Sequence, residues 1–285
     1  LLTRDSLNIV RYCNFKYGWG FPFFEFRNPT EPAETSAPLI ENCNFTKGAY
    51  TCIYITSGGS PTIRNCTFYD APTAIFIHGG DKIKVINCAI SNVACGIINA
   101  TLEEWRQELI VDHVTIYEVV REDSYEWANG YGIECGNWPG TLKVTNSIFV
   151  KVSKAGIKSS NGWTVENDYN CFYHNTWNTN DLISMGPHSF EADPLLVDPD
   201  NQDFGLQPGS PCRGQASDGL DIGYLPEYAT GIKWNGLGKT VNLVFPQEKI
   251  NGFFDLTGRK IKKANYIGIY FWEQKGRAVK GFSLF

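Results

Sequence analysis

The chain has 285 residues, of which 42% are hydrophobic and 14% aromatic, which is enough for a substantial core and excludes a disordered chain. Its net charge of −5 comes from acidic and basic residues scattered along the sequence, which excludes a basic surface for nucleic acid or anionic lipid. Apolar runs fall short of the roughly 18 residues that span a membrane, and the opening LLTRDSLNIVRY is not typical of a signal peptide.

A short line of sequence recurs five times and predicts the first strands. It lies at residues 9–18, 39–48, 63–71, 84–93 and 143–152, with a cysteine or serine in the same position. That position falls at 13, 43, 66 and 88, then at Val114, Ser147 and Asp168, in steps of 30, 23, 22, 26, 33 and 21 residues. A base period near 22, stretched by insertions at 18–38 and 121–131, indicates stacked repeats that bury their apolar faces against one another.

A second apolar–polar alternation follows in each repeat, at 52–59, 74–80, 96–100, 132–137 and 156–162. Short runs with period two, rich in Ile, Val and Phe, indicate strands, and no stretch of the repeat region has convincing helical spacing. Two or three strands in each repeat of this length is the geometry of a parallel β-helix coil. The predicted fold class is therefore all-β.

The repeated I-x-N-C-x-F followed by G-I-x resembles the right-handed parallel β-helix repeat family. The resemblance implies that each line is the same wall of a coil, stacked on the previous one over about seven coils. It also implies an asparagine ladder at a bend, with side-chain amides bonded along the stack and the cysteine position beside it facing the core. The ladder residues are Asn42, Asn65, Asn87, Asn146 and Asn167.

The nine cysteines fall into two groups. Four of them share the repeat position and are expected to be small buried hydrophobic residues that need no bond; they are Cys13, Cys43, Cys66 and Cys88. The sequence leaves open whether any two of the other five form a disulfide. These are Cys52, Cys95, Cys135, Cys171 and Cys212.

Residues 169–175 and 190–223 are similar to the closing stretch of many secreted bacterial β-helix proteins, D-P-x-F-V-D…D-F-x-L…S-P…D-I-G. The matching residues are Asp193, Pro194, Val197, Asp198, Asp203, Phe204, Leu206, Ser210, Pro211, Asp221, Ile222 and Gly223. The similarity implies a terminator that ends the helix and covers its last coil. Within it, DPDNQD (198–203) departs from the calcium-loop spacing and indicates a turn.

The last sixty residues lose the repeat and contain FFDLTGRKI and IGIYFW…GRAVKGFSL. They resemble the C-terminal sorting domain of type IX secretion cargo at Phe254, Asp255, Gly258, Arg259, Ile261, Gly268 and Tyr270. The usual upstream N-P segment is missing, and the alternative is a generic C-terminal β-sandwich that caps or docks. We therefore expect β-helix coils over 1–175, a terminator over 176–226 and a small β-sandwich-like domain over 227–285.

The second strand of each repeat predicts one face on which function could lie. If the isoleucines of this strand point inward, the residues after them point outward; they are Tyr54, Phe76, Ile98, Glu134 and Lys158. The first three form an apolar stripe, which is the predicted assembly surface. Glu134 and Lys158 form a polar pair, which is either a plain surface ion pair or a pair of catalytic candidates.

Two insertions carry further acids and aromatic residues. Asp123 and Glu126 are catalytic candidates, because glycosidases use acids paired across a groove. Aromatic faces suit pyranose rings, so the aromatic residues are predicted to bind a ligand, unless they only seal the loops onto the helix. They are Trp105, Tyr125, Trp127 and Trp138. No two histidines have ligand spacing, and neither a metal nor a cofactor is predicted.

The first repeat begins near Leu1, so its first coil would expose strands unless more chain precedes it or a partner covers it. End-to-end or lateral assembly with further copies would give such a cover. We expect an exported bacterial protein, extracellular or at the cell surface, with a structural, filament-forming or adhesive role. Its partners would be itself or a surface polysaccharide. The alternative is a polysaccharide lyase or glycoside hydrolase acting on an acidic polysaccharide.

Overall fold

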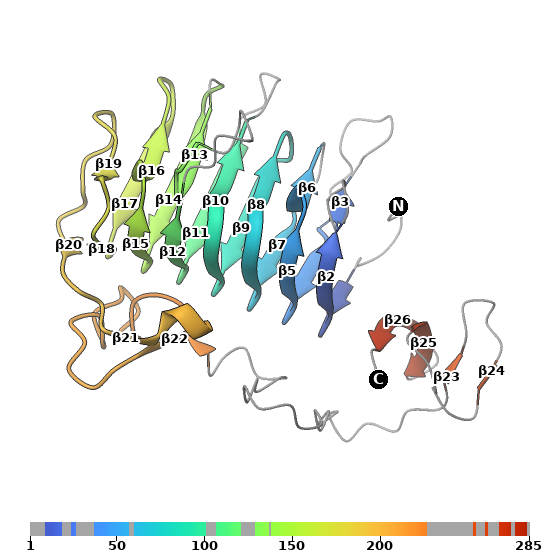
Figure 1. The fold of residues 1–285 in the computed structure, drawn as a ribbon. Helices are drawn as coiled ribbons and strands as arrows, with labels where there is room; N and C mark the ends of the chain where they lie inside the picture. The colour runs from blue at the N-terminus through green and yellow to red at the C-terminus, as the bar shows by residue number, and fades with distance from the viewer. Residues whose placement is uncertain are drawn as a thin grey trace.

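The computed structural model describes residues 9–18, 24–26, 37–56, 60–100, 107–120, 129–136 and 138–226, together with four short strands near the C-terminus. From residue 9 to residue 191, the strands pair in parallel with their counterparts one repeat away (Figure 1). This arrangement is a parallel β-helix, as the repeat predicts.

One wall of the helix is a seven-stranded parallel sheet in which the strands follow chain order. Its strands are β1 (Ile9–Arg11), β4 (Leu39–Glu41), β7 (Thr62–Arg64), β9 (Lys82–Ile86), β11 (Gln107–Asp112), β14 (Gly140–Thr145) and β17 (Thr164–Asp168). Seven strands in a row correspond to six steps from coil to coil, so the helix has about six turns rather than the seven coils expected.

The other wall is a thirteen-stranded sheet with two arms. The first arm contains β2 (Asn14–Gly18), β5 (Asn44–Gly48), β12 (Thr115–Val119), β15 (Ile148–Val152), β18 (Cys171–Tyr173) and β20 (Phe190–Glu191). The second arm contains β3 (Phe24–Phe26), β6 (Thr51–Ile55), β13 (Ile133–Cys135), β16 (Ala155–Ser159) and β19 (Trp177–Thr179). The long strands β8 (Thr67–Ile77) and β10 (Ala89–Asn99) belong to both arms, so they join them into one sheet.

The coils bend at residues that adopt the left-handed backbone conformation. One row of such bends lies between the two walls and consists of Tyr12, Asn42, Asn65, Asn87, His113, Asn146 and Tyr169. A second row, five residues further along each coil, consists of Lys47, Asp70, Asn92, Glu118, Lys151 and His174. Asparagine tolerates positive φ better than most residues, which explains why it recurs in the first row.

The predicted asparagine ladder is confirmed only in part. The Asn87 amide donates to Asn65 Oδ1 at 2.9 Å, as a ladder requires. At the last coil the predicted register is wrong by two residues: Asp168 pairs with Thr145, so Tyr169 takes the bend that was expected at Asn167. The core-facing position of this coil is accordingly Asn170 rather than Asp168.

The core is built from in-register stacks. Phe45 stacks on Phe15 and on Phe68 with ring centroids 4.9 Å apart, and Phe149 stacks on Phe172 at 5.2 Å. The cysteines of the repeat position lie in this core, as predicted, and each thiol donates to the carbonyl two residues earlier at 3.2 to 3.4 Å. All nine cysteines are buried, and none of them forms a disulfide.

The terminator first closes the end of the helix and then turns back along its outside. Ile183 joins the main core and Met185 packs against it. Beyond them, β21 (Leu196–Asp198) and β22 (Asp203–Leu206) form a hairpin with the short 3-10 helix Pro199–Asn201 between them. The hairpin leads into residues 207–226, which we call the return segment. A second buried cluster joins terminator and coils; it contains Ala89, Tyr117, Ile148, Val150, Cys171, Leu196, Phe204, Cys212, Ala216 and Ile222.

Three consecutive residues of the return segment each bond to a different coil. The N–H of Gly223 donates to the Asn146 carbonyl at 2.8 Å, that of Tyr224 to Thr115 Oγ1 at 2.9 Å, and that of Leu225 to Asn87 Oδ1 at 2.7 Å. The terminator therefore covers not only the last coil, as the sequence similarity implies, but also the three coils before it.

The C-terminal strands form a separate antiparallel sheet in the order β24 (Lys260–Ile261), β23 (Phe253–Phe254), β25 (Gly268–Gln274) and β26 (Arg277–Ser283). The sequence predicts a small β-sandwich-like domain over 227–285, and its bounds and sandwich form stay a prediction. The Asp255, Gly258 and Arg259 positions of the sorting-domain resemblance lie outside the described residues.

Candidate functional site

The structure confirms that the five predicted outward residues lie in one line across five coils. Tyr54 pairs with Phe76, Phe76 with Ile98, Ile98 with Glu134, and Glu134 with Lys158. The isoleucines before them are fully buried in the core. The alternation of inward and outward residues along the strand therefore predicted correctly which side chains form this face.

The apolar stripe is less exposed than the sequence predicts. Phe76 is only 9% exposed and Ile98 only 4%, so the expectation of an open apolar surface is wrong for these two side chains. They form a small cluster with Cys95, against which Tyr54, Ala100 and Tyr131 pack. The physical reason is that outward direction from a strand does not decide whether neighbouring side chains cover the residue. Assembly through this stripe stays a prediction.

Glu134 and Lys158 form a partly buried ion pair. Lys158 Nζ lies 2.7 Å from Glu134 Oε1, and the Asn129 amide donates to Glu134 Oε2 at 3.3 Å. The Lys158 ammonium also lies 5.4 Å from the centre of the Tyr131 ring. Both oxygens of the carboxylate are thus engaged, and the two charges compensate each other. This geometry fits a structural pair better than a free acid or base.

A tyrosine–histidine pair lies at the other end of the same face. Tyr54 Oη and His78 Nδ1 are 2.6 Å apart, and the His78 and Phe76 rings form a T-shaped pair with centroids 4.8 Å apart. Burial lowers the pKa of His78, so its imidazole is neutral near pH 7. No pattern in the sequence indicates this bond, because the two residues lie on different coils.

Most of the predicted loop residues lie outside the described residues. These are Trp105, Asp123, Tyr125, Glu126 and Trp127. Trp138 is described and is half-buried. The first coil before residue 9, where an open end was expected, is likewise outside the described part of the chain.

A cavity of about 420 Å³ opens at the last coil, between β18, β19 and the segment around β20. Its lining includes Tyr173, His174, Trp177, Asn178 and Glu191. The Trp177 side chain is 68% exposed, while the Tyr173 and His174 rings stack with centroids 3.9 Å apart. The Asn178 amide donates to Glu191 Oε1 at 2.5 Å. The cavity thus combines an exposed indole with amide, imidazole and carboxylate groups.

This cavity is not among the sites that the sequence predicts. A usable signal was the isolated Trp177 in the polar run HNTWNTN, since a tryptophan among asparagines and threonines has no apolar periodicity that would place it in a core. Glu191 carried no such signal, because only the fold brings β20 beside β18.

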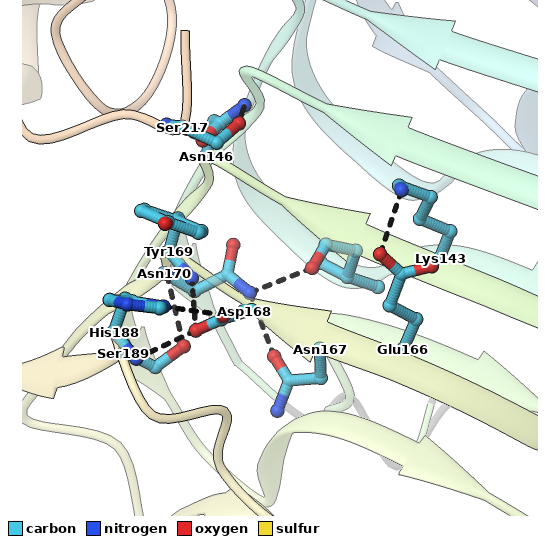
Figure 2. A network of polar contacts seen from close by, with 11 residues as sticks. Lys143, Asn146, Glu166, Asn167, Asp168, Tyr169, Asn170, His188, Ser189 and Ser217 are labelled. Atoms are coloured by element: carbon cyan, nitrogen blue, oxygen red, sulfur yellow. Dashed lines mark hydrogen bonds and ion pairs between the residues drawn. The ribbon is translucent and has the colours of Figure 1, made fainter. Parts of the chain in front are cut away.

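A polar network fixes the start of the terminator to the last coil (Figure 2). Asp168 accepts bonds from the His188 backbone N–H and from His188 Nδ1, both at 2.8 Å, and the Tyr169 and His188 rings stack at 4.3 Å. Burial opposes ionisation of Asp168, but the bonds from His188 and Tyr169 outweigh it and lower its pKa. Because its groups bond to one another, we assign this network to architecture rather than to ligand binding.

Among the described residues, no three His, Cys, Asp or Glu side chains are grouped so that they could hold a metal ion. The same part of the chain contains no helix that is long and apolar enough to cross a membrane.

Comparison with known families agrees with the fold. The family model described as right handed beta helix region matches residues 10–176, from the first described strand to the start of β19. A comparison with curated proteins finds no significant match. The matched residues make up more than half of the chain and form the stacked coils described above, and the chain belongs to the right handed beta helix family.

Proposed function

We propose that the protein is an exported bacterial β-helix protein with an adhesive role, and that it binds a polysaccharide at the cavity of the last coil. The observation that carries this proposal is the 68% exposed Trp177 at the wall of that cavity. A large apolar ring left open beside polar groups is a typical way to bind a ligand with one apolar and one polar side.

The chemistry of the cavity suits a sugar ring. The indole face can stack on the C–H face of a pyranose, while Asn178, His174 and Glu191 offer donors and acceptors for hydroxyl groups. These residues lie on or beside the paired strands β18, β19 and β20, which keeps them in place without a ligand. A preformed site loses little conformational entropy on binding.

Binding is favoured over catalysis by the state of the carboxylates. Glycoside hydrolysis requires two of them facing one bond. Glu191 is the one acid among the described residues that line the cavity, and it accepts a bond from Asn178. On the outward side of the second arm, the charge of Glu134 is compensated by Lys158. Neither arrangement offers a pair of free acids.

Export and assembly belong to the same proposal. The resemblance of the C-terminal segment to type IX sorting domains supports secretion to the cell surface. There, self-association through the end of the helix or through the Tyr54 side of the second arm would combine with polysaccharide binding to hold cells or matrix together.

Binding should depend on Trp177. We expect Trp177→Ala to weaken binding to the best polysaccharide of a panel about tenfold, because the stacking surface is lost. Leu182→Ala is the matched control, since Leu182 is 54% exposed but does not line the cavity; it should bind as the parent does. The measurement is titration of the full chain by calorimetry.

Equal affinity of the Trp177→Ala variant and the parent would refute the cavity as the binding site. The same panel also tests the alternative function. New ultraviolet absorbance from unsaturated sugars, abolished by Glu134→Ala or Lys158→Ala, would identify a lyase instead.

A further inference from the structure

Cys171 and Cys212 meet between the last coil and the terminator. Cys171 lies on β18 at the outer face of the helix, and Cys212 belongs to the return segment; both are fully buried in the cluster that joins these two parts. The two thiol groups are neighbours within this cluster. The Cys171 thiol also donates to the Ala192 carbonyl at 3.3 Å.

This pair differs from the cysteines of the repeat position, which also follow one another closely. Side chains in register on neighbouring parallel strands keep the strand spacing of about 4.8 Å, whereas a disulfide draws the two Cβ atoms to about 3.5–4.5 Å. Cys43 and Cys66 are held at that spacing by the backbone ladder on both sides. Cys212 is not part of a sheet: its N–H donates to Ser210 Oγ and its carbonyl accepts from the Ile222 N–H. Both bonds stay within the return segment, so no strand ladder sets the spacing of Cys212 from Cys171.

We propose that Cys171 and Cys212 form a disulfide when the protein meets a low-molecular-weight disulfide such as oxidised glutathione, and that this bond ties the terminator to the last coil. One protein thiolate attacks the glutathione disulfide and releases one glutathione thiolate. The second protein thiol, as its thiolate, then displaces the other glutathione. Two S–H bonds of the protein are lost, one S–S bond forms, and the two protons end on the two glutathione molecules.

The exchange is expected mainly while the terminator is undocked. The neighbouring Cys212 thiol and burial both raise the pKa of Cys171, so the folded protein holds little of the thiolate that attacks. Once formed, the bond closes a loop that contains Trp177, Glu191 and the β21–β22 hairpin. It would fix both the cavity wall and the return segment.

The test is thiol mapping on the full chain. The reduced protein is unfolded, refolded in a buffer of oxidised and reduced glutathione, alkylated and digested without reductant for mass spectrometry. We expect one linked peptide pair, containing Cys171 and Cys212, and seven alkylated cysteines. Nine alkylated cysteines, or a link between any other two, would overturn the proposal.

Two variants separate the bond from the packing of the thiols. In the parent, oxidation should raise Tm by roughly 10 °C relative to a sample in reductant. Cys212→Ser should show no such difference, whereas Cys52→Ala, which changes a cysteine of the main core, should keep both the link and the shift. If Cys212→Ser does not fold, the peptide map of the parent decides alone.

Discussion

At the scale of single residues, the asparagines at the bends of the β-helix have two roles: they adopt the backbone conformation of the bend, and some of them bond the terminator. Four asparagines of the first row of bends have φ between 50° and 55°; they are Asn42, Asn65, Asn87 and Asn146. In this region the backbone of asparagine is less strained than that of most residues. Asn87 and Asn146 also bond the terminator: Asn146 Oδ1 accepts the Ser217 N–H at 2.8 Å. The same residue type thus shapes the coil and holds what covers it.

Asn87→Ala should destabilise the protein by about 2–3 kcal/mol. The change loses the preference for positive φ, and it leaves the buried N–H of Leu225, which donates to Asn87 Oδ1, without its partner. The measurement is urea unfolding of the full chain followed by circular dichroism.

Asn42→Ala serves as the control, because Asn42 has the same backbone conformation but its buried Oδ1 accepts no hydrogen bond from the described residues. It should cost only about 1 kcal/mol. Equal losses in the two variants would mean that the bond to Leu225 contributes nothing measurable.

The sequence located the bends but not their last member. In VENDYN, Asn167 looks like the repeating asparagine, yet it pairs with Val144 and points to the end of the core. Tyr169 takes the bend instead. A pattern of residue types identifies the repeat as long as the coil length holds, and it fails where the final strand is read two residues out of register.

At the scale of elements, the D-I-G end of the terminator motif has a steric reason. Gly223 has φ +96°, and a Cβ built on it would lie 2.5 Å from Ile148 Cδ1 and 2.8 Å from Thr115 Oγ1. The glycine therefore allows the return segment to lie directly on the coils, so that three successive N–H groups reach three coils.

Gly223→Ala should release the return segment. We expect a loss of about 3 kcal/mol, from backbone strain and from the clash with Ile148 and Thr115. Gly219→Ala is closely matched, since Gly219 also has positive φ (+83°) but a Cβ there would meet nothing within 4 Å; it should lose only about 1 kcal/mol.

Limited proteolysis of the two variants measures the difference, as cleavage within 193–226 reports undocking. If both variants were cleaved at the same rate, close packing at Gly223 would not be what holds the segment.

What the sequence predicted at this scale was the strands and their inward and outward sides. It did not predict what lies on top of them. Phe76 is outward and still buried, and Ala89, Ile148 and Cys171 are outward residues that the terminator covers. The alternation of apolar and polar residues predicts on which side of the sheet a side chain lies. Whether that side chain is then buried depends on where a segment distant in the sequence packs, and a short-range pattern carries no information about that.

At the scale of the whole molecule, there are two cores with different connectivity. The main core runs without interruption along the coils, and each coil supports the next. The second cluster joins the terminator to the outer face of the last coils and can be lost without removing any residue from the main core.

Phe204→Ala should therefore undock the terminator while the coils stay folded. Removing a buried phenylalanine costs about 3–5 kcal/mol, and Phe204 is buried in the second cluster only. We expect fast proteolysis of the terminator with a nearly unchanged circular dichroism spectrum.

Val197→Ala, at a side chain of the same hairpin that is 47% exposed, should behave as the parent does. Cooperative loss of the whole spectrum in Phe204→Ala would show instead that the two cores fold as one unit.

The contacts of Gly223, Tyr224 and Leu225 also determine how the molecule would respond to mechanical load. If the chain after residue 226 were tethered to a surface, a pull on it would reach Leu225 at Asn87 first, then Tyr224 at Thr115, then Gly223 at Asn146. Hydrogen bonds that are loaded one after another rupture at low force. The parallel strands of the coils would therefore stay paired while the return segment peels away. A disulfide between Cys171 and Cys212 would stop that opening before it reached the cavity.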